Sequence, residues 1–188
     1  MIIQAVEVRD APELLSIFAH YVEKTAVSFE HEVPSLSEFE DRIRSISEKL
    51  PYLKAVSENG EILGYAYAGS FRKQKAYDWS VETTVYVRQD HKRMGIGKQL
   101  YDRLEAILKD IGILNMNACI ALPAENDTHV TMDSVYFHRQ MGFSSVGTFH
   151  KSGYKFDTWY DMIWMEKIIG IHNTAPEKVR FGKWRNQL

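Results

Sequence analysis

Residues 81–104 read VETTVYVRQDHKRMGIGKQLYDRL, and this stretch decides the fold. Its first part alternates strictly between two sets of side chains, which predicts a β-strand over residues 80–87. A short basic turn with two glycines follows. Apolar residues then recur at helical spacing from Ile96 to Ile111, which predicts a long amphipathic helix. The stretch is therefore a strand, a tight glycine turn and the start of a helix.

The glycine turn has the chemistry of an anion site. Helix N-termini leave backbone N–H groups unpaired and carry a partial positive charge. Gly95 and Gly97 allow a diphosphate to approach that backbone closely. Lys92, Arg93 and Lys98 add positive charge around it. The turn therefore predicts a site for a phosphorylated ligand.

Two familiar phosphate-binding motifs do not fit this turn. A Walker A loop needs a glycine where Lys92 stands and a serine or threonine where Gln99 stands. A Rossmann turn needs a small residue where Leu100 stands, and it follows the first strand of its unit. A loop that binds acyl-CoA fits the turn. The alternative is a polar turn without a ligand, in which the glycines are needed only for the backbone conformation.

The rest of the chain predicts a single α/β domain. An S-x-x-E capping box at Ser35 and Glu38 starts a helix that Pro51 ends, and Asn59-Gly60 indicates a hairpin. The other predicted strands are residues 2–8, 116–121, 144–149 and 158–166, and the other helices are 13–24 and 134–141. This order implies a mixed sheet with helices on both faces. We expect a domain over residues 1–169 and a tail over residues 170–188, either mobile or docked on a partner subunit.

Composition excludes several classes of function. The 188 residues include 45% hydrophobic and 26% charged side chains, with a net charge of −2, so neither nucleic acid nor anionic membrane is an expected partner. Cys119 is the single cysteine, and it lies in an apolar run typical of a core strand. No secretory signal, no membrane-spanning apolar run and no metal-ligand spacing of the histidines is recognisable, so we expect a cytoplasmic protein without a metal.

The glycine turn also carries a family resemblance. Residues 92–97, KRMGIG, resemble the [QR]-x-x-G-x-[GA] signature of the GNAT superfamily of N-acetyltransferases, with lysine in place of the usual glutamine or arginine. Four ordered segments (TAVSFEHEVPS, AYDWSVETTVYV, SVYFHRQMGF and GYKFDTWYDMIWMEK) resemble the phosphinothricin acetyltransferase-like subgroup. The resemblance extends to about Lys167. It implies a mostly antiparallel mixed sheet with a splayed central strand pair, and acetyl transfer from acetyl-CoA to a primary amine.

By this resemblance, acetyl-CoA binds in two places. The pantetheine arm is expected along the backbone of Val85, Tyr86 and Val87, and the diphosphate along the turn. Asn126 and Ser134 match family positions near the cofactor, with about five extra residues between them. The expected turn contacts are Lys92, Arg93, Met94, Gly95, Ile96, Gly97 and Lys98.

The resemblance names two candidates for proton transfer. Glu82 matches the acidic residue of the subgroup and is our candidate base, and burial would raise the pKa of such a carboxylate toward neutrality. A solvent-facing carboxylate paired with Arg72 is the plainer alternative. His138 stands where many superfamily members carry a tyrosine that protonates CoA, and a histidine packed against the sheet is equally compatible. Which of the two is acid and which is base stays open.

The acceptor side is implied by analogy as well. Phe29, Glu30, Tyr77 and Tyr154 are the expected substrate contacts, whereas Trp159 fits core packing better. Gln74 stands where the resistance enzymes have an arginine, and glutamine cannot bind a phosphinate or carboxylate bidentately. We therefore expect a small amino acid or amino-acid analogue as acceptor, and a homodimer. A peptide N-terminal acetyltransferase and a non-catalytic acyl-CoA-binding module are the alternatives.

Overall fold

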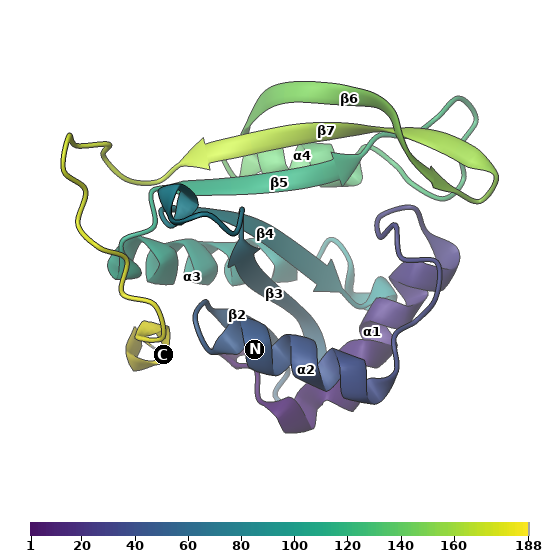
Figure 1. Cartoon of the computed structure of the whole chain (residues 1–188). Coiled ribbons are helices and arrows are strands. Elements are labelled where there is room, and N and C mark those ends of the chain that lie inside the picture. The colour runs from purple at the N-terminus through teal and green to yellow at the C-terminus, as the bar shows by residue number, and fades with distance from the viewer. Residues whose placement is uncertain (188) are drawn as a thin grey trace.

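The structure, a computed structural model, describes residues 1–187 and contains one seven-stranded sheet in the order β1-β2-β3-β4-β5-β7-β6 (Figure 1). Every neighbouring pair is antiparallel except β4 and β5. The strands are β1 (Ile2–Ala5), β2 (Tyr52–Val56), β3 (Ile62–Ser70), β4 (Ser80–Val87), β5 (Asn115–Ala121), β6 (Ser144–Lys155) and β7 (Thr158–Ile168). The α-helices are α1 (Ala11–Lys24), α2 (Leu36–Ser47), α3 (Ile96–Ile111) and α4 (Asp133–Gln140).

The predicted order of elements is confirmed, and local signals explain it. Both hydrogen bonds of the capping box at Ser35 and Glu38 form at the start of α2. Gly60 has φ 86° in the turn between β2 and β3, a conformation that glycine adopts without steric cost. The first strand is shorter than predicted because Val8–Asp10 forms a 3-10 turn that leads into α1.

The central strands splay apart. β4 pairs with β3 along Val81–Val87, but it pairs with β5 only from Ser80 to Glu82. Beyond that point β5 continues to Ala121 against β7 alone. The predicted splayed pair is therefore present. Glu82 is the last residue of β4 that is paired with both neighbouring strands, β3 and β5.

The register identifies which backbone groups face the opening. Arg88 donates to the carbonyl of Leu63 at 2.9 Å, just beyond the paired residues of β4 and β3. Because hydrogen-bonded pairs alternate along an antiparallel ladder, the even-numbered residues of β4 bond to β3. The odd-numbered residues, Thr83 and Val85 among them, therefore direct their N–H and C=O groups toward the splay.

The two faces of the sheet have separate cores. Leu100, Leu104 and Leu108 of α3 are fully buried on one face, where α4 contributes Val135. On the other face, α1 and α2 cover a cluster rich in tyrosine and phenylalanine (Figure 1). Its aromatic members include Phe18, Tyr21, Phe39, Tyr52, Tyr65 and Tyr86. Helices thus lie on both faces, as predicted. Within residues 1–187, none of the helices is long and apolar enough to cross a membrane.

The C-terminal segment differs from the expected tail. Trp184 is 0% exposed, belongs to the α3-side core and donates its indole N–H to the carbonyl of Ser47 at 3.0 Å. The backbone N–H groups of Arg180 and Gly182 donate to Ile111 and Lys49. Residues 179–184 therefore dock on the domain itself through the buried tryptophan, whereas residues 171–178 are exposed.

Candidate active site

The glycine turn forms the N-terminus of α3. Gly95 has φ 77°, a conformation that favours glycine, and an added Cβ there would meet nothing within 4 Å. A Cβ on Gly97 would lie 3.3 Å from the ring of Phe137 in α4. Ile96 is buried, so only its backbone is available to a ligand. The turn therefore presents an exposed backbone at the positive end of a helix, as the anion-site prediction requires.

The charged side chains of the turn lie at its surface. Lys98 pairs with Asp102 at 2.6 Å, and Arg93 lies 3.6 Å from Asp133 at the start of α4. Lys92 lies over the ring of Tyr21 at 5.2 Å, and desolvation lowers its pKa. Met94 is 64% exposed. The three cations are placed to meet an anion, and Lys98 and Arg93 would exchange their acidic neighbours for it.

Two of the three β4 residues expected to bind pantetheine, Tyr86 and Val87, have backbone groups that are already paired. The hydroxyl of Tyr21 donates to the carbonyl of Val87 at 2.6 Å and accepts from its N–H at 3.2 Å, so both groups already have a partner. Tyr86 bonds to β3 through its backbone, and its side chain is buried against Phe18 and Tyr21. Of the three residues expected to hold pantetheine, Val85 alone combines the right direction with a free edge. Thr83, which was not predicted, shares that direction.

Asn126 and Ser134 lie in different surroundings. Asn126 is exposed on the loop after β5 and has φ 59°. Ser134 lies in the first turn of α4, beside the glycine turn, and its carbonyl accepts from the imidazole of His138 at 2.7 Å. The structure thus places Ser134 beside the glycine turn and leaves Asn126 exposed on the loop after β5.

Glu82 lies at the fork of the splay, on the α1 and α2 face of the sheet. Burial raises its pKa, and the nearby charge of Arg72 lowers it in part. The guanidinium of Arg72 stacks on Phe71 at 4.4 Å and lies 5.7 Å from the ring of Trp164. Glu82 therefore combines the position and the raised pKa of a general base.

His138 lies on the other face of the sheet. It is 6% exposed, and its Nε2 lies 3.0 Å from the hydroxyl of Tyr101 in α3. That hydroxyl lies 3.2 Å from Thr83, whose own hydroxyl donates to the carbonyl of Asn117 at 3.2 Å. His138, Tyr101 and Thr83 thus form a polar cluster that ends at the fork, in which the one hydroxyl proton of Tyr101 serves either His138 or Thr83. Burial lowers the pKa of His138 to about 4, so its imidazole is neutral at pH 7.

The expected acceptor residues separate into two groups. Phe29 and Glu30 lie in the loop after α1, and Glu30 forms a bidentate pair with Arg42 of α2 at 2.7 and 2.9 Å. Tyr77 is 43% exposed and packs edge-on against Phe71, next to Arg72. These side chains border the face of the sheet that carries Glu82.

Tyr154 and Gln74 do not join that group. Tyr154 is 45% exposed and packs on Trp159 at the outer face of the β6–β7 hairpin, because its neighbours Gly153 and Lys155 take the inward positions. Trp159 is also 56% exposed and not a core residue. Gln74 is exposed before a 3-10 turn, with no side-chain hydrogen bond among residues 1–187.

The comparisons with known proteins agree with this geometry. A glycine turn at a helix N-terminus, beside a splayed parallel strand pair, fits the acyl-CoA site that the family resemblance implies. The chain belongs to the GNAT acetyltransferase domain family, whose pattern matches residues 3–164. It is similar to a phosphinothricin N-acetyltransferase of Streptomyces viridochromogenes, with 35% identity over 91% of this chain and 88% of that protein.

Two further relatives describe the subgroup. An L-methionine sulfoximine/L-methionine sulfone acetyltransferase of Pseudomonas aeruginosa is 29% identical over 90% of this chain and 95% of that protein. The crystal structure of a phosphinothricin acetyltransferase from Sinorhizobium meliloti in complex with AcCoA superposes with a TM-score of 0.84. It is 28% identical and covers 95% of this chain and 93% of that one. The predicted family and fold are confirmed, and the chain is an acetyltransferase.

Sequence reasoning missed four side chains of this region. Arg42, Tyr21 and Tyr101 make their contacts across large distances in sequence, and no local pattern indicates them. Arg72 was considered only as a surface partner of Glu82. Its position two residues before Gln74, in a segment that resembles the family, was the one available signal.

Proposed function

We propose that this enzyme transfers the acetyl group of acetyl-CoA to the primary amine of a small amino-acid-like acceptor, directly within a ternary complex. One observation carries the proposal: Glu82, with a pKa raised by burial, lies at the fork where β4 leaves β5. The relatives named for phosphinothricin and methionine sulfoximine support this class of acceptor.

The residues present fit acetyl-CoA. The N-terminus of α3 and the basic side chains Lys92 and Arg93 would hold the diphosphate. The free carbonyl of Thr83 and the backbone groups of Val85 would bond the pantetheine amides, and the N–H of Val85 would hold the oxygen of the tetrahedral intermediate. When bound, acetyl-CoA supplies the activated acetyl thioester. The chain supplies position, donors and proton transfer.

Glu82 is the base in this proposal. An amine attacks a thioester only when it is neutral, and a carboxylate with a raised pKa can take its proton directly or through a water. His138 is neutral at pH 7 and reaches the fork only through Tyr101 and Thr83. We therefore assign it to orienting the hydroxyl of Tyr101 near the fork, while the departing thiolate takes up the proton that Glu82 removed from the amine, directly or through a water. Burial raises the pKa of Cys119 to about 11, so its thiol stays protonated and direct transfer is favoured over a covalent intermediate.

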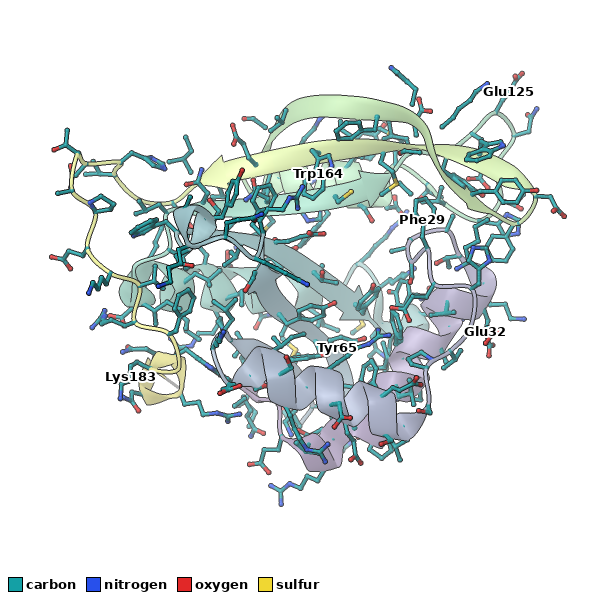
Figure 2. The ribbon with its side chains drawn as sticks, in the orientation of Figure 1. Phe29, Glu32, Tyr65, Glu125, Trp164 and Lys183 are labelled. Carbon is teal, nitrogen blue, oxygen red and sulfur yellow. The ribbon has the colours of Figure 1, made fainter. Side chains whose placement is uncertain are left out.

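Arg72 is the proposed partner of the acceptor carboxylate or phosphinate. Its guanidinium lies beside Glu82 and is oriented by the rings of Phe71 and Trp164. Figure 2 shows Trp164 on the face of the sheet that looks toward α2. Arg72 thus offers the bidentate cation that Gln74 cannot supply. An amino acid bound there would direct its amine toward Glu82.

The test is thiol release from acetyl-CoA with amino acids, methionine sulfoximine, phosphinothricin, polyamines and short peptides. Turnover confined to free amino acids and their analogues supports the proposal, and turnover of peptides alone would favour the N-terminal acetyltransferase. Binding of acetyl-CoA without any turnover would favour the non-catalytic module.

The base is tested with Glu82→Gln. We expect kcat at pH 7 to fall about 100-fold or more, because general base catalysis contributes on this order, with acetyl-CoA affinity unchanged. Glu58→Gln, an exposed carboxylate in the β2–β3 turn, is the control. A wild-type rate and pH profile in Glu82→Gln would contradict the assignment.

A cytoplasmic homodimer completes the proposal. Val146, Phe149 and Trp159 are each more than half exposed on the β6–β7 hairpin, and a second copy is the expected cover for them. Light scattering on the purified protein tests this, and a monomer over the micromolar range would contradict it.

A further inference from the structure

Lys155 is a lysine buried at the inner end of β6. The residue is 3% exposed, and its ammonium donates to the carbonyls of Val22 at 2.7 Å, Thr25 at 3.0 Å and Ser28 at 2.6 Å. An ammonium has three N–H donors, so these three bonds use all of them. Within residues 1–187 no carboxylate forms an ion pair with it. Its hydrogen-bond partners are therefore backbone carbonyls alone, and the ring of Phe156 lies 5.1 Å from the ammonium.

The three carbonyls belong to one short stretch of chain. Val22 lies in the last turn of α1, where carbonyl groups lack helical partners and a cation is favoured. Thr25 and Ser28 lie in the loop that follows. The hydroxyl of Thr25 satisfies the neighbouring carbonyl of Tyr21 at 2.7 Å. Lys155 thus caps a carbonyl in the last turn of α1 and also binds the following loop, so that both are held at the end of β6.

The loop held in this way leads directly to the acceptor candidates. Phe29 follows Ser28, and a Cβ added to Gly153 would lie 2.1 Å from Cε2 of its ring. The ring therefore lies directly on the backbone of β6, two residues from Lys155. Figure 2 shows Phe29 where the loop after α1 meets the β6–β7 hairpin. Glu30 is fixed from the other side by Arg42 of α2.

We propose that Lys155 is a positioning residue for the acceptor, holding the Thr25–Glu30 loop so that Phe29 and Glu30 form one wall of the acceptor site. This rests on the proposed function. The acetyl-CoA contacts lie on β4 and α3, which Lys155 does not touch. Loss of the clamp should therefore weaken acceptor binding and leave acetyl-CoA binding unchanged, whereas a merely structural lysine would alter stability alone.

The test compares Lys155→Met with Lys24→Met. Methionine has a similar length and no donors, and Lys24 is an exposed lysine of the same last turn of α1, so the control removes a charge there without touching the loop. In Lys155→Met we expect the acceptor KM to rise at least about tenfold, the effect of losing about 1.4 kcal/mol of binding. The acetyl-CoA KM should stay within about twofold, and Lys24→Met should match the wild type in both.

Hydrogen exchange supplies a readout that does not depend on turnover. Amides of residues 22–30 should exchange faster in Lys155→Met than in the wild type or Lys24→Met. A folded Lys155→Met with wild-type acceptor KM would overturn the proposal. If this variant does not fold, Lys155→Arg is measured instead. Its planar guanidinium cannot direct three donors to the same three carbonyls, and an unchanged acceptor KM would again overturn the proposal.

The two proposals fail in distinguishable ways. If the wild type acetylates no amino acid or analogue, the proposed acceptor class is wrong, and exchange of residues 22–30 still decides whether the clamp exists. If the wild type acetylates such an acceptor but the two KM values of Lys155→Met rise together, the clamp does not act selectively on the acceptor.

Discussion

Lowering the pH from 7 to 5 should destabilise the protein through His138. Burial lowers its pKa from 6.5 to about 4 in the folded state, whereas the unfolded chain has the ordinary value. Between pH 6.5 and pH 4 the unfolded state therefore binds a proton at His138 and the folded state does not. The free energy of unfolding is at its full value above pH 6.5 and decreases as the pH falls toward 4. The linkage gives a loss of about 2 kcal/mol at pH 5 and about 3 kcal/mol at pH 4.

The assay is urea unfolding at pH 7 and pH 5, for the wild type and His138→Gln. Glutamine does not titrate. Between pH 7 and pH 5 the free energy of unfolding of His138→Gln should therefore decrease by about 2 kcal/mol less than that of the wild type. His31→Gln, at an exposed histidine, should follow the wild type. The reasoning is refuted if His138→Gln and the wild type lose the same stability between pH 7 and pH 5. A lower stability of the variant at both pH values is expected and does not bear on the comparison, because Tyr101 and Ser134 lose a partner.

Three further substitutions test the framework of the site. Gly97→Val should raise the acetyl-CoA KM about tenfold in steady-state kinetics, a loss of about 1.4 kcal/mol of binding, because a side chain pressed against Phe137 displaces the backbone of the turn. An unchanged KM would remove the turn from the cofactor site. Tyr21→Phe should lower the free energy of urea unfolding by about 1–3 kcal/mol, because the N–H and C=O of Val87 lose their partner; wild-type stability would show that they find another. Trp184→Ala should cost about 3–5 kcal/mol in thermal unfolding, and a loss below about 1 kcal/mol would restore the view of this segment as a loose tail.

Local chemistry accounts for what could be predicted. The capping box at Ser35 starts α2, and the Asn59-Gly60 turn joins β2 to β3, because caps and turns depend on residues within a few positions of one another. The glycine turn before α3 was recognisable for the same reason. Family resemblance then placed Glu82, which the strand alternation puts on the face away from α3.

Contacts between distant segments account for the rest. Alternation alone would bury Tyr154 and expose Lys155, but Lys155 is buried on three carbonyls, one in the last turn of α1 and two in the loop after it. His138 falls on the face opposite Glu82 because α4 packs beside α3, which no spacing in the sequence expresses. By itself the sequence determined the order of elements, the splayed acetyltransferase fold and the glycine turn before α3. The tertiary structure alone decided which polar groups meet at the fork and around the acceptor loop, because a buried donor takes the acceptor that packing brings to it, however far away that acceptor lies in the chain.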